Sequence, residues 1–211
     1  MKDFSKAPFI LCYHLGCISR YIFYERSVPM SSFNEVFESF STNLAGVNGA
    51  SVRTTKKELG KTIADLFAAQ GLKSVCVAET PLLKEAGVAE ALKAAGIEVF
   101  TDHIRLHAET AQGGIAEAAY GIAELGSMLQ VGDAVDARIA ATMSEDFFGI
   151  IKASTIVETY DDMFDIISGW TDMPNFVGFI TGPSRTADIE CVSAVGVHGP
   201  LRLTAVVIED A

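Results

Sequence analysis

The first half of the chain alternates short apolar runs with amphipathic stretches. Apolar residues recur at helical spacing in three stretches, and Gly71 and Gly96 close two of them. Between these stretches lie short, mostly apolar runs such as SVCVA and IEVF, which are typical of buried strands. The pattern predicts helices over 33–44, 56–71 and 88–96, and strands over 50–54, 74–78 and 97–100. This alternation favours an α/β fold with a mostly parallel sheet.

The second half continues the alternation, with a different segment in its middle. Residues 115–132 hold two apolar runs around Leu125-Gly126-Ser127, which predicts a pair of strands or one strand bent at the glycine. Beyond this segment the pattern predicts helices near 136–143, over 155–170 and from about Arg185, and strands over 148–152, 176–180 and 201–208. We therefore expect a single α/β domain over residues 30–211, with helices flanking its sheet. Residues 1–29 form an N-terminal extension in this interpretation, because an ordinary domain start first appears at Met30.

The net charge of the 211-residue chain is −11 at pH 7. Proteins that bind the backbone of DNA or RNA carry a cluster of Lys and Arg side chains, and the sequence has no such cluster. We therefore expect no nucleic-acid partner. Because the overall field repels anions, an anionic ligand has to be held by one or two positioned cations and backbone N–H groups.

The cysteines are scattered, at Cys12, Cys17, Cys76 and Cys191, and form no Cys-x-x-Cys pair. Iron–sulfur clusters and structural zinc ions usually take ligands with clustered spacing. We therefore expect no cofactor in this chain, and free thiols in a reducing cytosol. The apolar stretch at 7–17 is too short and too broken by polar residues to cross a membrane. These features predict a cytoplasmic protein.

A polar stretch, TGPSRTADIECVSAVGVHGP, separates the last two apolar runs. A helix start predicted within it would offer free N–H groups to a carboxylate or phosphate, and the Arg185 guanidinium suits the same anions. The candidate ligand-binding residues are Gly182, Ser184, Arg185, Thr186 and Asp188, and His198 is a candidate catalytic residue. The alternative is structural: Ser184 caps the helix, Arg185 pairs with Asp188 or Glu190, and His198 is a hydrogen-bonded loop residue.

Glu124 is the second candidate for chemistry. It ends an apolar run and precedes Gly126 and Ser127, whose N–H groups are candidates to hold an anion nearby. A carboxylate at a partly buried strand end can have a raised pKa, which suits a general base or nucleophile. A solvated turn residue is an equally good interpretation.

Two patterns that suggest a metal are set aside. His103 and His107 are four residues apart, but no third ligand is evident, and Ile104 and Leu106 indicate strand alternation. His107-Ala-Glu109 matches the first half of the zinc-deaminase signature, whose Pro-Cys-x-x-Cys half is missing from the sequence. We therefore expect no metal site.

The second half of the sequence resembles the LUD (lactate utilisation) domain family, in particular its lactate utilisation protein C type. GPSRTADIE at 182–190 and GVHGP at 196–200 match that family's motifs, and YGIAELGS at 120–127 is similar to its Tyr-x-Ile-Ala-Glu-Thr-Gly-Thr motif. Arg138 falls in step with the same pattern, which adds it to the candidate ligand-binding residues. The resemblance implies a fold similar to that of ribose-phosphate isomerases and CoA-transferases.

The resemblance also implies a role in oxidising lactate to pyruvate, beside two partner proteins that carry iron–sulfur clusters. This chain would then be the cluster-free component. It departs from the family pattern, however: Ala119 replaces an Asp, Leu125 replaces a Thr, and residues 142–147 replace a segment with two prolines and a histidine. Three functions therefore stay open: an accessory component that binds a small anion, a stand-alone isomerase or acyl-CoA transferase using Glu124 and Arg185, and a non-catalytic structural or regulatory module.

Overall fold

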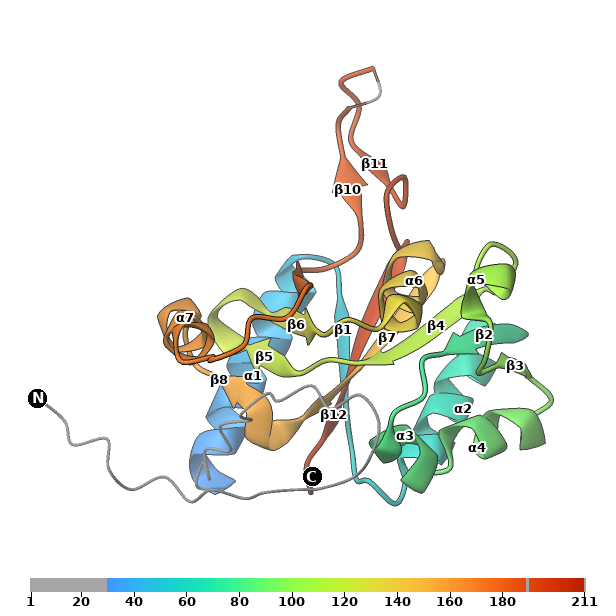
Figure 1. Ribbon diagram of the computed structural model, residues 1–211, viewed down its shortest axis with the longest axis horizontal. Coiled ribbons are helices and arrows are strands. Elements are labelled where there is room, and N and C mark those ends of the chain that lie inside the picture. Colours follow the sequence, from blue (N-terminus) through green and yellow to red (C-terminus); the bar gives the residue numbers. More distant parts are fainter. Residues whose placement is uncertain (1–29, 189, 211) are drawn as a thin grey trace, which may run out of the picture.

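A six-stranded parallel sheet forms the centre of the protein (Figure 1). The computed structural model describes residues 30–188 and 190–210. The strand order is β1-β12-β7-β4-β2-β3, and every neighbouring pair is parallel. The strands are β1 (Ala50–Thr54), β2 (Ser74–Val77), β3 (Glu98–Phe100), β4 (Gly113–Glu117), β7 (Asp146–Lys152) and β12 (Arg202–Ile208). The predicted α/β class is confirmed, whereas the N-terminal extension predicted over residues 1–29 lies outside the described residues.

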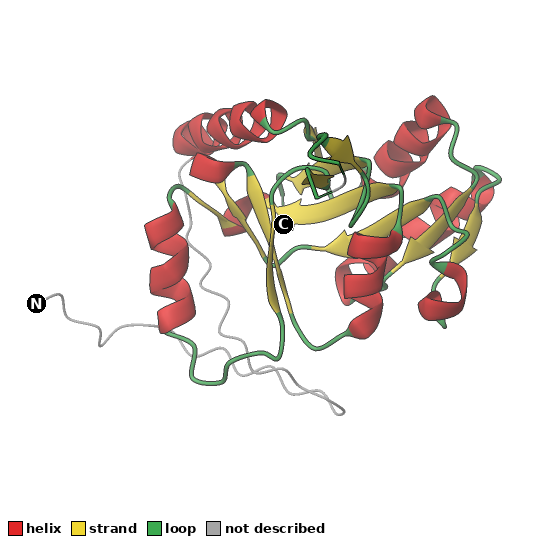
Figure 2. Ribbon diagram, turned by 90° about the horizontal axis from the view of Figure 1, so that it is seen from above, coloured by secondary structure: helices red, strands yellow, loops and turns green. Residues whose placement is uncertain are grey.

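Helices cover both faces of this sheet (Figure 2). They are α1 (Met30–Gly46), α2 (Leu59–Gln70), α3 (Pro81–Glu85), α4 (Val88–Ala94), α5 (Ile104–His107), α6 (Val135–Met143) and α7 (Tyr160–Ser168), with 3-10 turns η1 (Ala123–Leu125) and η2 (Ala153–Thr155). Helices α2, α3 and α4 pack on one face, and α1, α5 and α6 contribute to the core on the other. The strand predicted at Ile104 and Leu106 is wrong, because these residues form the short helix α5.

Successive residues of the central strands supply the two cores in turn. In β7, Phe147 packs with the α1 and α6 side chains, while Phe148 packs on the opposite face against Phe67 of α2, with ring centroids 4.7 Å apart. This alternation follows from the pleat of a strand, which directs neighbouring side chains to opposite faces. Strands buried on both faces explain why these segments are nearly continuous apolar runs.

A second sheet of four strands packs beside the first, in the order β8-β5-β6-β9. Its strands are β8 (Ile156–Val157), β5 (Tyr120–Ile122), β6 (Ser127–Val131) and β9 (Val177–Ile180). Met128 of β6 joins the core shared with α1, whereas Leu129 points to the outer face, where Met163 of α7 covers it. The pair of strands predicted on either side of Gly126 is confirmed as β5 and β6, which are antiparallel.

Two predictions for the second half are corrected. The segment 155–170 is not all helix, because it first completes η2 and forms β8, and α7 begins only at Tyr160, with Thr159 as its N-cap. The apolar run 176–180 forms β9, but in the small sheet, antiparallel to β6, and Phe179 remains 40% exposed. Ile180 packs against the core shared with α1, and Val177 packs on the outer face with Met163, so the run is apolar although none of its residues is fully buried.

The helix predicted from about Arg185 is wrong. A hairpin stands there instead, formed by β10 (Arg185–Thr186) and β11 (Ala194–Val195), and it projects from the body on the side opposite the C-terminus (Figure 1). Ser, Thr and Asp favour turns as well as helix caps, and the β-branched residues Val192, Val195 and Val197 favour strands over helix. The expected helix dipole and free helical N–H groups are therefore not available to a ligand at this point.

Candidate functional site

The end of β9 and the base of the hairpin line an open pocket of about 360 Å³. This volume lies at the lower end of the range for small-molecule sites. The pocket adjoins the last turn of α6 and the residues that lead into β12, so it lies at the amino ends of the parallel strands β7 and β12. Its lining consists of Gln130, Ala141, Thr142, Phe176, residues 178–185 and residues 198–200.

Two separate motifs meet at this pocket. Gly182, Ser184 and Arg185 come from the first motif, and His198 comes from the second. Arg185 and His198 are the basic residues of the lining, and none of the described lining residues is acidic. In a chain of net charge −11, this gives the pocket a local composition suited to an anion.

Ser184 fixes the base of the hairpin. Its hydroxyl accepts a hydrogen bond from the backbone N–H of His198 at 3.2 Å, its own N–H donates to the carbonyl of Pro200 at 2.9 Å, and its carbonyl accepts from the N–H of Gly196 at 2.9 Å. These three bonds hold the Arg185 segment beside the His198 segment. Ser184 is thus a positioning residue for the pocket, while its hydroxyl proton stays available for a ligand.

Gly182 allows the first motif to pack closely on the body of the protein. Its φ of +73° lies in the left-handed region, and a Cβ atom at this position would lie 2.5 Å from the carbonyl oxygen of Val47. A residue with a side chain would therefore push the strand end away from the α1–β1 loop. Glycine is therefore needed here for two reasons: it lets the strand end pack on the α1–β1 loop, and it keeps the first motif in place at the pocket.

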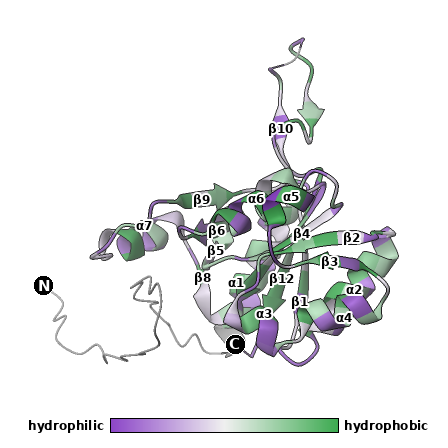
Figure 3. Ribbon diagram, turned by 45° about the vertical axis from the view of Figure 1, so that its right-hand side comes forward, coloured by the Kyte–Doolittle hydropathy of each residue, from purple (hydrophilic) through white to green (hydrophobic). Residues whose placement is uncertain are grey.

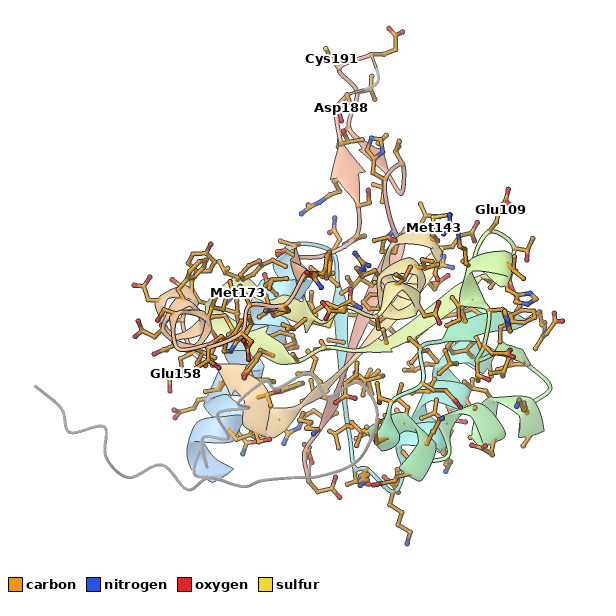
Figure 4. The ribbon with its side chains drawn as sticks, in the orientation of Figure 1. Glu109, Met143, Glu158, Met173, Asp188 and Cys191 are labelled. Carbon is orange, nitrogen blue, oxygen red and sulfur yellow. The ribbon has the colours of Figure 1, made fainter. Side chains whose placement is uncertain are left out.

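Thr186 and Asp188 lie on the hairpin beyond the pocket. The Thr186 hydroxyl accepts a hydrogen bond from the Asp188 N–H at 3.2 Å, and Asp188 lies toward the outer end of the hairpin (Figure 4). The Asp188 carboxylate is 3.8 Å from Nε2 of His198, with both side chains mostly exposed. An exposed pair at this distance contributes little stability. The predicted pairing of Arg185 with Asp188 or Glu190 is not among the ion pairs of the described residues.

Ser127 and Arg138 contact residues that line the pocket. The buried Ser127 hydroxyl is 2.6 Å from that of Thr181, which lines the pocket. The guanidinium carbon of Arg138 lies 5.2 Å from the centre of the Phe176 ring, another lining residue, and its buried Nε has no hydrogen-bond partner among the described residues. These two predicted ligand-binding residues thus contact the lining without being part of it.

Glu124 and Gly126 lie away from the pocket. The Glu124 carboxylate accepts a hydrogen bond from the Tyr160 N–H at 2.9 Å, at the first residue of α7. The Gly126 N–H donates to the carbonyl of Ala123 at 3.2 Å, so it is already used within the η1 turn. Glu124 therefore stabilises the start of a helix in this structure, as an exposed carboxylate near the positive end of the helix dipole.

We expect Glu124→Gln to retain both stability and ligand binding, whereas Glu124→Ala should lower the free energy of unfolding by about 1 kcal/mol. Glutamine keeps an oxygen that accepts the Tyr160 N–H, and alanine removes it. Urea unfolding followed by circular dichroism measures the difference. If Glu124→Gln abolished a turnover that the wild-type protein shows while its unfolding was unchanged, Glu124 would be a catalytic residue after all.

Several lining residues were not anticipated from the sequence. Thr181 and Thr142 add hydroxyls, and the buried Gln130 donates a hydrogen bond from Nε2 to the carbonyl of Ala137 at 2.9 Å. Phe176 and Phe179 supply aromatic walls. The sequence signal for Gln130 was a polar residue within the apolar run of β6. Phe179 had no such signal, because its exposure depends on the position of β9 at the edge of the small sheet.

The described residues contain no group of three or more His, Cys, Asp or Glu side chains placed to hold a metal ion. Of the cysteines, Cys76 is buried and Cys191 is exposed on the hairpin, while Cys12 and Cys17 lie outside the described residues. Burial raises the pKa of the Cys76 thiol above its ordinary value, which keeps it protonated and unreactive. None of the described helices is long and apolar enough to span a membrane.

The fold and the sequence are similar to those of known proteins. A structure with a TM-score of 0.61 is that of a DUF162 family protein from Deinococcus radiodurans, 17% identical, covering 83% of this chain and 98% of that one. A "Lactate utilization protein C" from Anoxybacillus flavithermus is 29% identical over 85% of this chain and 83% of its own length, and one from Halalkalibacterium halodurans is 31% identical over 75% and 73%. The model of the LUD domain matches residues 37–208, which include both pocket motifs, and the chain therefore belongs to the LUD domain family.

Proposed function

We propose that this chain acts in lactate utilisation as a component without iron–sulfur clusters, which binds a small carboxylate and works beside iron–sulfur proteins. The observation that carries the proposal is the meeting of the Gly182–Arg185 and His198–Pro200 segments at one pocket with two basic and no acidic lining residues. The relatives named "Lactate utilization protein C" supply the biological context, and lactate and pyruvate are small carboxylates.

The pocket offers three kinds of contact to such a ligand. The guanidinium of Arg185 can bind a carboxylate through two parallel hydrogen bonds, and His198 can donate a further one. The hydroxyls of Ser184 and Thr181 are suited to the 2-hydroxyl or 2-keto oxygen of the ligand. The apolar rings of Phe176 and Phe179 are suited to its methyl group. This division of polar and apolar walls is the reason why we favour a short 2-hydroxy or 2-keto acid.

Calorimetric titration of the full chain with L-lactate and with pyruvate tests the proposal, with inorganic phosphate as the comparison anion. We expect Arg185→Gln to weaken binding of the carboxylates at least about tenfold, because a charge-assisted pair of hydrogen bonds is lost. Arg105→Gln is the matched control, since Arg105 is exposed on α5 and does not line the pocket. Equal affinities for the wild-type protein and Arg185→Gln would contradict the proposed site.

A separate binding experiment tests the proposed iron–sulfur partners. Purified iron–sulfur proteins of lactate oxidation from the same host, with their clusters reconstituted, should form a complex with the chain that light scattering detects. If neither protein binds under conditions where both are folded, the proposed place of this chain beside iron–sulfur proteins is wrong. The carboxylate titration is independent of this result, so the two parts of the proposal are tested separately.

A further inference from the structure

Three aromatic side chains form a cluster on the surface at the α7 end of the molecule. Tyr160 and Phe164 belong to α7, and Phe179 belongs to β9; their exposed fractions are 41%, 43% and 40%. The ring centroids of Tyr160 and Phe164 are 4.6 Å apart, and that of Phe179 lies 5.9 Å and 6.0 Å from these two. We call these three residues the aromatic platform. Figure 4 labels Glu158 and Met173 in the same part of the molecule.

The platform is separate from the core that α7 helps to build. The buried residue of α7 is Met163, and Ile166 and Ile167 pack with it on the outer face of the small sheet. Tyr160 and Phe164, four residues apart, lie together on another side of the same helix. In Figure 3 apolar and polar residues mix on α7, and β9 beside it is largely apolar. Single exposed apolar residues are ordinary on a protein surface, but three aromatic rings in contact make a patch of the kind that marks an interaction site.

The charges of the chain segment that carries the platform all have one sign. Every charged side chain between Ala153 and Ser184 is acidic, and this segment forms β8, α7 and β9. The acidic residues are Glu158, Asp161, Asp162, Asp165 and Asp172. Asp162 is engaged in the capping box with Thr159, whereas Asp161 and Asp165 are exposed on α7. An aromatic centre with a charged rim is the arrangement found in protein–protein interfaces.

We propose that the aromatic platform is the docking surface for a protein whose matching face has an apolar centre and a rim of Lys and Arg. Basic side chains are attracted both by the acidic rim and by the electron-rich faces of the exposed rings. A second copy of this chain does not fit, because two platforms facing each other would bring their acidic rims together. The identification of the partner as an iron–sulfur protein rests on the function proposed above.

The platform is joined to the pocket through one residue. Phe179 completes the platform and also lines the pocket. A partner docked on the platform would therefore contact the strand that forms one wall of the ligand site. This arrangement would place the partner beside a bound carboxylate, whereas docking at the α2–α4 side of the central sheet would not.

The test measures binding of the reconstituted iron–sulfur proteins to immobilised full-length chain by surface plasmon resonance. The variant is Tyr160→Ala/Phe164→Ala, which keeps Phe179, the platform residue that also lines the pocket. We expect its affinity to fall by at least about tenfold, since exposed aromatic residues at an interface centre commonly dominate the binding energy. The control Leu106→Ala/Val135→Ala removes apolar side chains that are 75% and 49% exposed elsewhere, and should bind like the wild-type protein.

The acidic rim is tested by Asp161→Asn/Asp165→Asn, which keeps the shape of both side chains. Its association rate should fall several-fold while its dissociation rate changes little, and added salt should slow association of the wild-type protein more than that of the variant. An unchanged association rate would contradict the basic partner face.

The outcomes separate the two proposals. If the wild-type protein binds the iron–sulfur proteins and the Tyr160→Ala/Phe164→Ala variant binds equally well, the docking surface lies elsewhere, while the proposed function stands. If the wild-type protein binds none of them, the partner part of the proposed function fails, and this inference fails with it. If sedimentation shows that the wild-type chain forms a dimer that the variant does not, the platform joins two copies, and the inference of a basic partner is wrong.

Discussion

Replacing Gly126 by alanine should lower the free energy of unfolding by about 3 kcal/mol or more. Gly126 follows η1 with a φ of +59°, a conformation that alanine adopts at a cost of about 1 kcal/mol. In addition, an added Cβ atom would lie 2.1 Å from the backbone nitrogen of Leu44 and 2.6 Å from the carbonyl carbon of Asn43. These are backbone atoms of α1, so no side-chain rotation relieves the overlap, and the helix itself has to move.

Gly71→Ala is the control for the contribution of the backbone conformation alone. Gly71 ends α2 with a φ of +71°, close to that of Gly126, and a Cβ atom there would have nothing within 4 Å. We expect it to cost only about 1 kcal/mol. Urea unfolding of the two variants measures the difference. Equal losses would show that α1 does not pack against Gly126 as closely as the structure has it.

The close approach of Gly126 to α1 gives the motif at 120–127 a structural role. The sequence suggested that the N–H groups of Gly126 and Ser127 hold an anion. In the structure, Asn43 of α1 donates a hydrogen bond from Nδ2 to the carbonyl of Ala123 at 2.9 Å, and Gly126 packs on the next residue of the same helix. The motif therefore attaches α1 to the small sheet. The sequence alone does not distinguish a glycine required for close packing from one required for ligand binding.

The central sheet could be predicted because its physical cause is local. A run such as SVCVA is apolar at consecutive positions since Val75 and Cys76 enter the cores on opposite faces. Helices ended by glycine, such as α2, also leave a sequence signal, because a left-handed residue there closes the last turn. In both cases the information lies within a few residues of the element that it specifies.

The candidate site could be predicted only in part, because it depends on distant contacts. Arg185 and His198 were singled out as candidates, and the structure brings both to one pocket, but through a hairpin instead of the predicted helix. The partner of Glu124 is the N–H of Tyr160, which is 36 residues away along the chain. The residues next to Glu124 in the sequence do not show whether its carboxylate is catalytic or accepts a hydrogen bond at a helix start.

Asp146 and Arg202, the first residues of β7 and β12, form an ion pair. The pair lies at the amino ends of these strands, the same end of the sheet as the pocket. Both carboxylate oxygens accept hydrogen bonds from the guanidinium, and the bond from Nη2 to Oδ2 measures 2.6 Å. The bond to Asp146 raises the pKa of Arg202, which keeps the guanidinium charged. The two partners differ in burial, because the side chain of Asp146 is 1% exposed and that of Arg202 is 57% exposed.

This difference predicts unequal effects of removing each partner. Arg202→Gln leaves a buried carboxylate without its counter-charge and should cost about 3 kcal/mol of unfolding free energy. Asp146→Asn leaves a guanidinium that water can solvate, and should cost about 1 kcal/mol. The double variant should be more stable than Arg202→Gln alone, since the uncompensated buried charge is gone.

Glu209→Gln, which breaks the more exposed pair with Arg53, should cost less than about 1 kcal/mol. Thermal and urea unfolding of the four variants at pH 7 measures these values, and a larger loss for Asp146→Asn than for Arg202→Gln would contradict the burial that the structure assigns to the two side chains.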